Sequence, residues 1–165
     1  MIAVSNSSPL IILARLGCFP LLNQLFSRLI ISPEVYKEVV VAGEGLPGAR
    51  EVAGAAWIGR GQLQDPGSLA RVAKQHSLGA GELSAILLAK ECRANAVLLD
   101  DHQARQLAKR EGLTVLGTVG LLEAFYVRGH LPDLGETFRK LLAENVYIDK
   151  RLLERRLKLL GLPAL

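Results

Sequence analysis

Short, wholly apolar runs alternate with helical patterns along the chain, and this alternation constrains the fold more than any other feature. The clearest run is 96–99, and 2–4 and 29–31 have the same character. A strand buried on both faces has this continuous apolar composition, whereas a strand with one wet face alternates apolar and polar residues. We add strands at 57–58 and 113–116. The sequence therefore predicts an α/β fold with a parallel sheet that helices cover on both faces.

The last part of the chain differs from the rest because it is helical only. After Gly129 the pattern predicts helices over 132–144 and 149–160, both rich in Leu and the second strongly basic. The length of 165 residues fits a single domain. We therefore expect a domain over 1–130 and a helical extension, 131–165, packed on the same domain. The extension could complete the core, form a dimer contact or hold a partner.

Composition and charge restrict the partners and the location. The net charge is +4, which permits a polyanionic partner without requiring one. Aromatic residues make up 5% of the chain, so we do not expect an extended stacking platform for single-stranded nucleic acid. Cys18 and Cys92 lie far apart and have no metal-ligand spacing, which predicts free thiols in a reducing compartment. No signal peptide and no apolar segment of membrane-spanning length is present, so we expect a cytoplasmic protein without membrane contact.

Polar residues follow the predicted strands at their carboxyl ends, where ligands gather in open parallel sheets. Asn6 follows the first strand, the pair Asp100-Asp101 follows the fourth, and Thr118 follows the fifth. Two helices add acidic residues at the same edge, and these are Glu38 and Glu82. Like charges this close are unfavourable without a hard cation such as Mg²⁺ or Mn²⁺. A metal held there can activate water and neutralise a phosphate, which is the chemistry of phosphodiester hydrolysis.

Simpler structural roles compete with these assignments. Asn6 could cap or stabilise the turn before the helix near Pro9, for which Ser8 is our predicted N-cap. Glu38 could be a solvated residue, and Glu82 could only complement its helix dipole. Of the two aspartates we expect one to cap the next helix and the other to bind metal, and we favour Asp101 for the metal. Thr118 could simply cap the following helix.

Five segments together resemble the PIN domain, and in particular a prokaryotic branch related to the VapC-like toxins. The segments are SNSSPLI (5–11), SPEVYKEV (32–39), LGAGELSAILLA (78–89), VLLDDHQAR (97–105) and VLGTVGLL (115–122). The resemblance covers about residues 1–130, and the motif order is intact. It implies a three-layer α/β/α sandwich, Mg²⁺ or Mn²⁺, and ribonuclease activity on RNA. It also implies a homodimer and a small antitoxin protein as partner.

The same resemblance assigns roles by position. Asn6 stands where PIN nucleases usually have their first metal-binding Asp, and an amide oxygen there brings no negative charge. Glu38 matches the second acidic position, Glu82 the acid that opens the central helix, and Asp101, beside Asp100, the acid after the fourth strand. Thr118 matches a polar position that holds the metal or its waters. The implied catalytic residues are Glu38, Glu82 and Asp101, and the implied metal ligands are Asn6, Glu82, Asp100, Asp101 and Thr118.

Three functions remain as alternatives to a toxin ribonuclease. A PIN-like module could bind RNA or protein and cut poorly because of Asn6. A phosphoacceptor receiver domain is disfavoured, since it needs an acidic pair after the first strand and a lysine after the last. A phosphate loop at 79–81 is disfavoured because the full glycine-rich fingerprint is missing.

Overall fold

Five parallel strands form the centre of the molecule. The computed structural model describes all residues, 1–165, and its sheet has the order β3-β2-β1-β4-β5 with every neighbouring pair parallel. The strands are β1 (Ile2–Ser5), β2 (Arg28–Ile31), β3 (Ile58–Arg60), β4 (Ala96–Leu98) and β5 (Val115–Leu116). The predicted parallel sheet and α/β class are therefore confirmed.

Successive strand residues contribute to two separate apolar layers, one on each face of the sheet. Ala3 and Leu98 belong to the larger cluster, whereas Val4 and Val97 belong to the smaller one. All four are no more than 5% exposed. Because the side chains of a strand alternate between faces, a strand buried on both sides must be apolar throughout, as these runs are.

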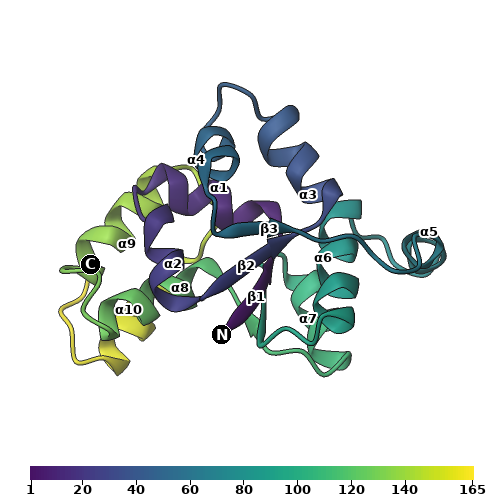
Figure 1. Cartoon of the computed structure of the whole chain (residues 1–165). Coiled ribbons are helices and arrows are strands. Elements are labelled where there is room, and N and C mark those ends of the chain that lie inside the picture. Colours follow the sequence, from purple (N-terminus) through teal and green to yellow (C-terminus); the bar gives the residue numbers. More distant parts are fainter.

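Helices cover both faces of the sheet, which gives the three layers seen in Figure 1. Helices α6 (Ala80–Glu91) and α7 (His102–Arg110) pack on the smaller apolar cluster. The larger cluster is covered mainly by α1 (Ser7–Arg15), α2 (Leu22–Leu25), α8 (Thr118–Val127), α9 (Leu134–Ala143) and α10 (Lys150–Leu159). The remaining elements are η1 (Phe19–Leu21), α3 (Pro33–Tyr36), the π-helical turn η2 (Lys37–Val41), α4 (Ala49–Gly54) and α5 (Gly67–Ala73).

Two helix starts near the sheet edge show what local sequence can predict. Ser32 caps α3, because its Oγ accepts a hydrogen bond from the Val35 amide at 3.1 Å, and Pro33 takes the first helical position. At α1 the predicted N-cap, Ser8, was wrong by two residues, because Asn6 occupies that position. The helix already begins at Ser7, so Ser8 lies inside it and does not cap it.

The C-terminal helices share the main core. Leu134 and Phe138 of α9 and Leu153 and Leu157 of α10 are at most 1% exposed and belong to the same cluster as α1 and α8. This packing brings the segment between α9 and α10 to the carboxyl edge of the sheet. None of the helices has both the length and the apolar character needed to cross a bilayer.

Candidate active site

The strand order creates a switch point between β1 and β4. The chain runs outward from β1 through β2 to β3, and then returns to place β4 on the other side of β1. In open α/β sheets the connections leaving such a pair diverge, and the crevice outside their carboxyl ends is where ligands bind. Asn6 directly follows β1, and its backbone N–H donates to the Leu98 carbonyl of β4 at 3.0 Å. The first and fourth strand ends are therefore adjacent.

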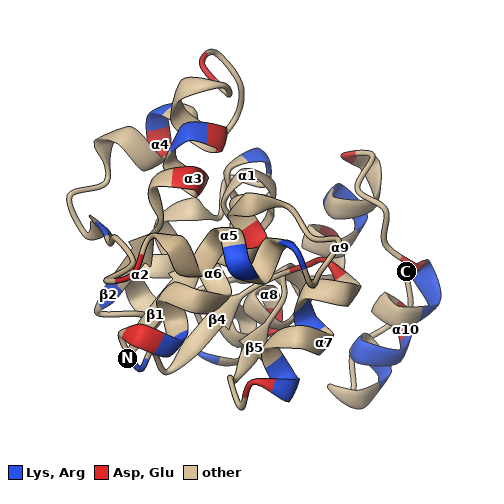
Figure 2. Ribbon diagram, turned by 90° about the vertical axis from the view of Figure 1, so that its right-hand side faces the viewer, with Lys and Arg blue, Asp and Glu red and all other residues tan.

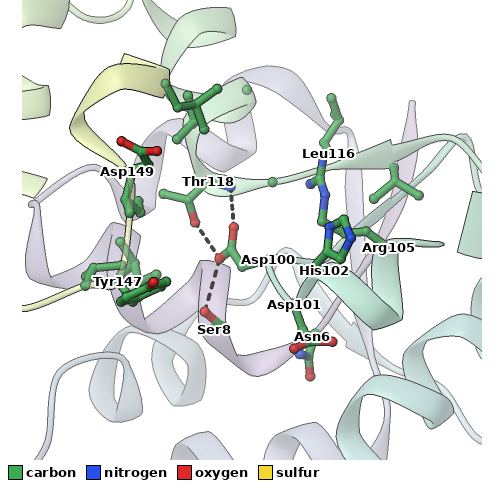
Figure 3. A pocket seen from close by; sticks show the side chains of 18 of the residues that line it. Asn6, Ser8, Asp100, Asp101, His102, Arg105, Leu116, Thr118, Tyr147 and Asp149 are labelled. Atoms are coloured by element: carbon green, nitrogen blue, oxygen red, sulfur yellow. Dashed lines mark hydrogen bonds between the residues drawn. The ribbon is translucent and has the colours of Figure 1, made fainter. Parts of the chain in front are cut away.

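A cavity of about 900 Å³ opens at this edge. Its wall includes five of the six residues that the sequence predicts for the site: Asn6, Glu82, Asp100, Asp101 and Thr118. Figure 3 labels all of these except Glu82. Glu38 is not part of the wall. The fold thus gathers side chains from positions 6 to 118 at one place.

The Asn6 side chain has no structural partner. The residue is 6% exposed and occupies the N-cap position of α1, yet its side chain makes no capping hydrogen bond. Its Oδ1 is the one buried side-chain polar atom of the protein without a hydrogen-bond partner. An unsatisfied buried polar group costs on the order of 1–3 kcal/mol, so its persistence calls for an explanation. Capping does not explain it, whereas an oxygen kept free for a ligand does.

Asp100 is fully engaged by the protein. Its Oδ1 accepts from the Thr118 amide at 2.7 Å, and its Oδ2 accepts from Thr118 Oγ1 at 2.7 Å and from Ser8 Oγ at 3.1 Å. These bonds, drawn in Figure 3, connect the end of β4 to the first turns of α1 and α8. Thr118 itself is fully buried and donates to Asp100, so it does not cap α8. Asp100 therefore holds the cavity wall together.

Asp101 is the residue that caps α7. Its Oδ2 accepts from the Ala104 amide at 2.9 Å, whereas its Oδ1 accepts no hydrogen bond. One of the two aspartates caps the helix as expected, but it is Asp101, the residue favoured for the metal, so the expected division of the two roles between the aspartates is not observed. Since capping uses one oxygen and the residue is exposed, the other oxygen stays available to a ligand.

Glu82 combines a capping role with an unfavourable charge environment. Its Oε2 accepts from the Gly79 amide at 2.7 Å at the start of α6. Burial raises the pKa of this carboxyl above its ordinary value, and the charges of Asp101 and Glu38 raise it further, although the Gly79 hydrogen bond opposes both. The same bond occupies the amide that a phosphate loop would offer at 79–81. The geometry therefore does not support a phosphate-binding loop at residues 79–81.

Glu38 reaches the first turn of α6 from the π-helical turn η2. Ser7 Oγ donates a short hydrogen bond to its carboxylate. A Cβ on Gly81 would lie 2.5 Å from Glu38 Oε1, so any larger residue there would force this carboxylate to shift. Glu38 is exposed, but it is anchored, and it is close enough to contribute to the raised pKa of Glu82. Single π-helical turns within helices often occur at functional sites.

Two residues that closely follow Asp101 also line the cavity, and these are His102 and Arg105. Arg105 donates to the Leu99 carbonyl at 2.9 Å and passes over Gly117, where a Cβ would be 2.5 Å from its Nη1. Lys109 and Arg110 lie on the exposed side of α7, outside the wall. Ser7, which holds Glu38, was not among the predicted site residues, and neither was the wall formed within residues 146–156.

Comparison with known families identifies the family to which the chain belongs. A family model described as a PIN domain matches residues 2–162. The chain belongs to the PIN-domain family. A search of curated proteins gives no match. PIN domains are generally nucleases that use divalent metal ions and act on nucleic acids. The match extends past residue 130 and includes the two C-terminal helices.

The side chains of this PIN domain can be compared with what a divalent cation needs. No three acidic, His or Cys side chains converge closely enough to form a complete metal cage by themselves. Each acidic group is held by a local donor, but one oxygen of Glu38, Glu82 and Asp101 accepts no hydrogen bond. Together with the orphaned Asn6 Oδ1 these are hard oxygen donors, the type that Mg²⁺ and Mn²⁺ prefer. The donor set fits such an ion.

The raised pKa of Glu82 predicts how replacing this carboxyl group changes the thermal stability of the protein. In EDTA, Glu82→Gln is expected to raise the unfolding midpoint near pH 8 and to leave it unchanged near pH 4. A Gln keeps the capping bond to Gly79 and removes the charge. Because folding raises this pKa above its ordinary value of 4.5, the folded state binds the proton more tightly than the unfolded state does. The wild type therefore loses stability as the pH rises from 4.5 through the pKa of the folded state. Thermal unfolding across this pH range measures the effect. A difference that does not vary with pH would contradict it.

Proposed function

We propose that this PIN domain is a metal-dependent endoribonuclease that hydrolyses RNA phosphodiester bonds at the edge between β1 and β4. The observation that supports this most strongly is the buried, unpartnered oxygen of Asn6 in a cavity wall shared with Glu82, Asp100 and Asp101. We assign Asn6, Glu82 and Asp101 to direct contact with the ion. Asp100 and Thr118 form the supporting wall through their mutual hydrogen bonds.

A bound Mg²⁺ or Mn²⁺ would supply Lewis-acid activation of water and charge neutralisation at the phosphate. Glu82 would contribute a carboxylate oxygen to the ion, and the positive charge of the ion would relieve the repulsion that Glu82 experiences from Asp101 and Glu38. Glu38 is held by Ser7 over Gly81 and keeps negative charge next to Glu82. Arg105 lines the same cavity and can orient a phosphate.

The direct test is cleavage of a mixed RNA substrate that contains both paired and unpaired regions. With Mn²⁺ the wild type is expected to cut this RNA, and EDTA is expected to stop the reaction. If no RNA is cut in Mn²⁺ or Mg²⁺, the nuclease proposal fails. The second candidate function is a module that binds RNA without cutting it, because the amide of Asn6 contributes no charge to the site. RNA binding without cleavage would support that function.

We further propose that the ribonuclease is the toxin of a toxin–antitoxin pair, forms a homodimer and is neutralised by a small partner protein. This part rests on the resemblance to the VapC-like branch. Growth arrest upon expression of the chain alone, relieved by co-expression of a small protein encoded next to it, supports the toxin role.

Replacing Asn6 with aspartate separates metal binding from fold stability. In Asn6→Asp we expect the Kd for Mn²⁺ to fall by about tenfold, because a charged oxygen replaces a neutral one. In EDTA the same variant should unfold at a lower temperature, since it adds a buried carboxylate beside Glu82 and Asp101. Calorimetric titration and thermal unfolding measure the two effects.

A matched control is Asn95→Asp at the opposite edge of the sheet. Asn95 Oδ1 accepts from the Ile2 amide at 2.7 Å, and a carboxylate can keep that bond. This variant should leave Mn²⁺ affinity unchanged. Equal affinities in the wild type and Asn6→Asp would place Asn6 outside the metal shell.

A further inference from the structure

The cavity has a second wall that faces the acidic edge. It is formed by the segment between α9 and α10 and by one side of α10, and its residues are Val146, Tyr147, Ile148, Asp149, Leu152 and Arg156. Figure 3 shows Tyr147 and Asp149 across the cavity from Asp101 and His102. Because both walls enclose one cavity, a ligand bound at the acids extends toward this segment. The volume of about 900 Å³ is at the upper end of the usual range for ligand pockets.

Tyr147 is presented to solvent by anchored neighbours. Its relative exposure is 105%, and it is the one aromatic among the exposed large hydrophobic residues. Val146 and Ile148 are half-buried and pack against the main core. The backbone is thus fixed on both sides, while the ring stands free at the mouth of the cavity. A free aromatic face at the end of a binding cavity is suited to stack on a flat ligand.

The surroundings of the ring are charged. Helix α10 carries the basic residues Lys150, Arg151, Arg155, Arg156 and Lys158, visible in blue in Figure 2. Arg151 pairs with Asp149, and Arg156 pairs with the buried Glu123 at 2.7 Å. The other three form no ion pair. A basic helix thus adjoins the exposed ring.

This combination selects one kind of occupant. The cores of protein interfaces are depleted in charged residues, whereas Tyr147 is followed by Asp149, Lys150 and Arg151. A single-stranded nucleic acid needs aromatic faces for its bases and positive charge for its backbone. Tyr147 on this wall offers the aromatic face, and the adjoining helix α10 offers the charge through Lys150, Arg155 and Lys158, which form no ion pair. The bases of a duplex are stacked inside it and are not available to the ring.

We propose that Tyr147 stacks on a nucleobase of a single-stranded RNA segment whose neighbouring phosphates lie along the basic side of α10. The proposal rests on the proposed nuclease function, because it places the scissile phosphate at the acidic wall. It gives Tyr147 and the basic C-terminal helix a role in substrate binding. One exposed ring binds one base, which agrees with the low aromatic content of the chain.

The test measures binding without cleavage. A fluorescently labelled single-stranded RNA of mixed sequence is titrated with full-length protein in EDTA, and anisotropy gives the Kd. Tyr147→Leu is expected to bind about tenfold more weakly, because an aliphatic side chain cannot stack on the base. Tyr147→Phe should match the wild type. Leu46→Ala is the control, since Leu46 is 63% exposed and lies outside the cavity.

Several results would overturn the proposal. They are wild-type affinity in Tyr147→Leu, an equal loss in Tyr147→Phe, wild-type binding to duplex RNA as tight as to single strands, or no RNA binding by the wild type. A lower mass of Tyr147→Leu in sedimentation would instead identify the wall as an interface between two copies and would also overturn it.

The outcome is distinguishable from failure of the nuclease function. In Mn²⁺, Tyr147→Leu should raise KM by about tenfold and leave kcat near the wild-type value, because the acidic wall is untouched. If no variant cuts RNA but the binding differences persist, the nuclease proposal fails and the stacking site stands.

Discussion

Replacing Asp101 with asparagine is expected to lower the rate of RNA cleavage by about 100-fold or more, while the protein remains folded and as stable as the wild type. The expected loss corresponds to roughly 2.7 kcal/mol of transition-state stabilisation. The reason is that one aspartate performs two tasks with its two oxygens. Oδ2 caps α7 by accepting from the Ala104 amide, and Oδ1 is free at the cavity.

Asparagine separates these two tasks. Its side-chain oxygen caps helices as well as aspartate does, so the bond to Ala104 is retained. The negative charge is lost, and with it the attraction for a divalent cation. We therefore expect weaker Mn²⁺ binding in calorimetry and little cleavage, with a thermal unfolding midpoint in EDTA within about 2 °C of the wild type.

Asp133→Asn provides the matched control. Asp133 caps α9 through the Glu136 amide at 2.9 Å, so the same chemical change occurs at the same kind of position outside the cavity. This variant should cut RNA at the wild-type rate. Full activity in Asp101→Asn would remove Asp101 from the active site and leave it as a helix cap only.

The sequence predicted the sheet and its functional edge because both depend on local composition. An apolar run such as 96–99 must be buried on both faces, and a parallel sheet places the ends of its strands at one edge. From that edge the positions of Asn6, Asp100, Asp101 and Thr118 follow without knowledge of any side-chain contact. Four of the six predicted site residues line one cavity for this reason, and the fifth, Glu82, lines it from the first turn of α6.

Roles within the edge were harder to predict because they depend on the path of the backbone. Asp100 and Asp101 are adjacent, and either could cap the next helix. The turn after β4 directs Asp101 toward α7 and Asp100 toward Thr118. Likewise, the segment SNSSP does not predict that α1 begins at Ser7. With this start, the Asn6 side chain makes no capping hydrogen bond and Ser8 points toward Asp100.

The wall around Tyr147 could not be predicted from the sequence. It meets the acidic edge only because α9 and α10 pack on the main core, and no periodicity connects residue 147 with residue 101. The overall aromatic content also concealed it, since a low average says nothing about where one exposed ring lies. The π-helical turn that carries Glu38 is similar, because its extra residue per turn leaves no mark in the composition.

Removing the Asp100 carboxylate is expected to destabilise the protein strongly, in contrast to the Asp101 variant. In Asp100→Ala we expect a loss of about 3 kcal/mol or more in the free energy of unfolding, which corresponds to a fall of about 10 °C in the unfolding midpoint. The carboxylate accepts three hydrogen bonds, two of them from Thr118, which is fully buried. Without it, the amide and hydroxyl of the buried Thr118 lose their acceptor.

Thr118→Val tests the same network from the other side. Valine has nearly the shape of threonine and removes only the hydroxyl donor, so we expect a smaller loss of about 1 kcal/mol. Because the two residues are in direct contact, their effects should not add. The Asp100→Ala, Thr118→Val double variant should be more stable than the sum of the single losses predicts, by about 1 kcal/mol. Urea unfolding of the four proteins in EDTA measures this coupling without any contribution from metal.

Asp133→Ala is the control for the loss of a carboxylate. Its carboxylate is exposed and accepts from the amide of the exposed Glu136, not from a buried donor, so the expected cost is about 1 kcal/mol. If Asp100→Ala cost no more than Asp133→Ala, Asp100 would not be the residue that holds the cavity wall. Asp100 would then be free to serve as a metal ligand, and Asp101 would have the structural role. A large loss in EDTA places the structural task on Asp100 and leaves the charge of Asp101 for the ion.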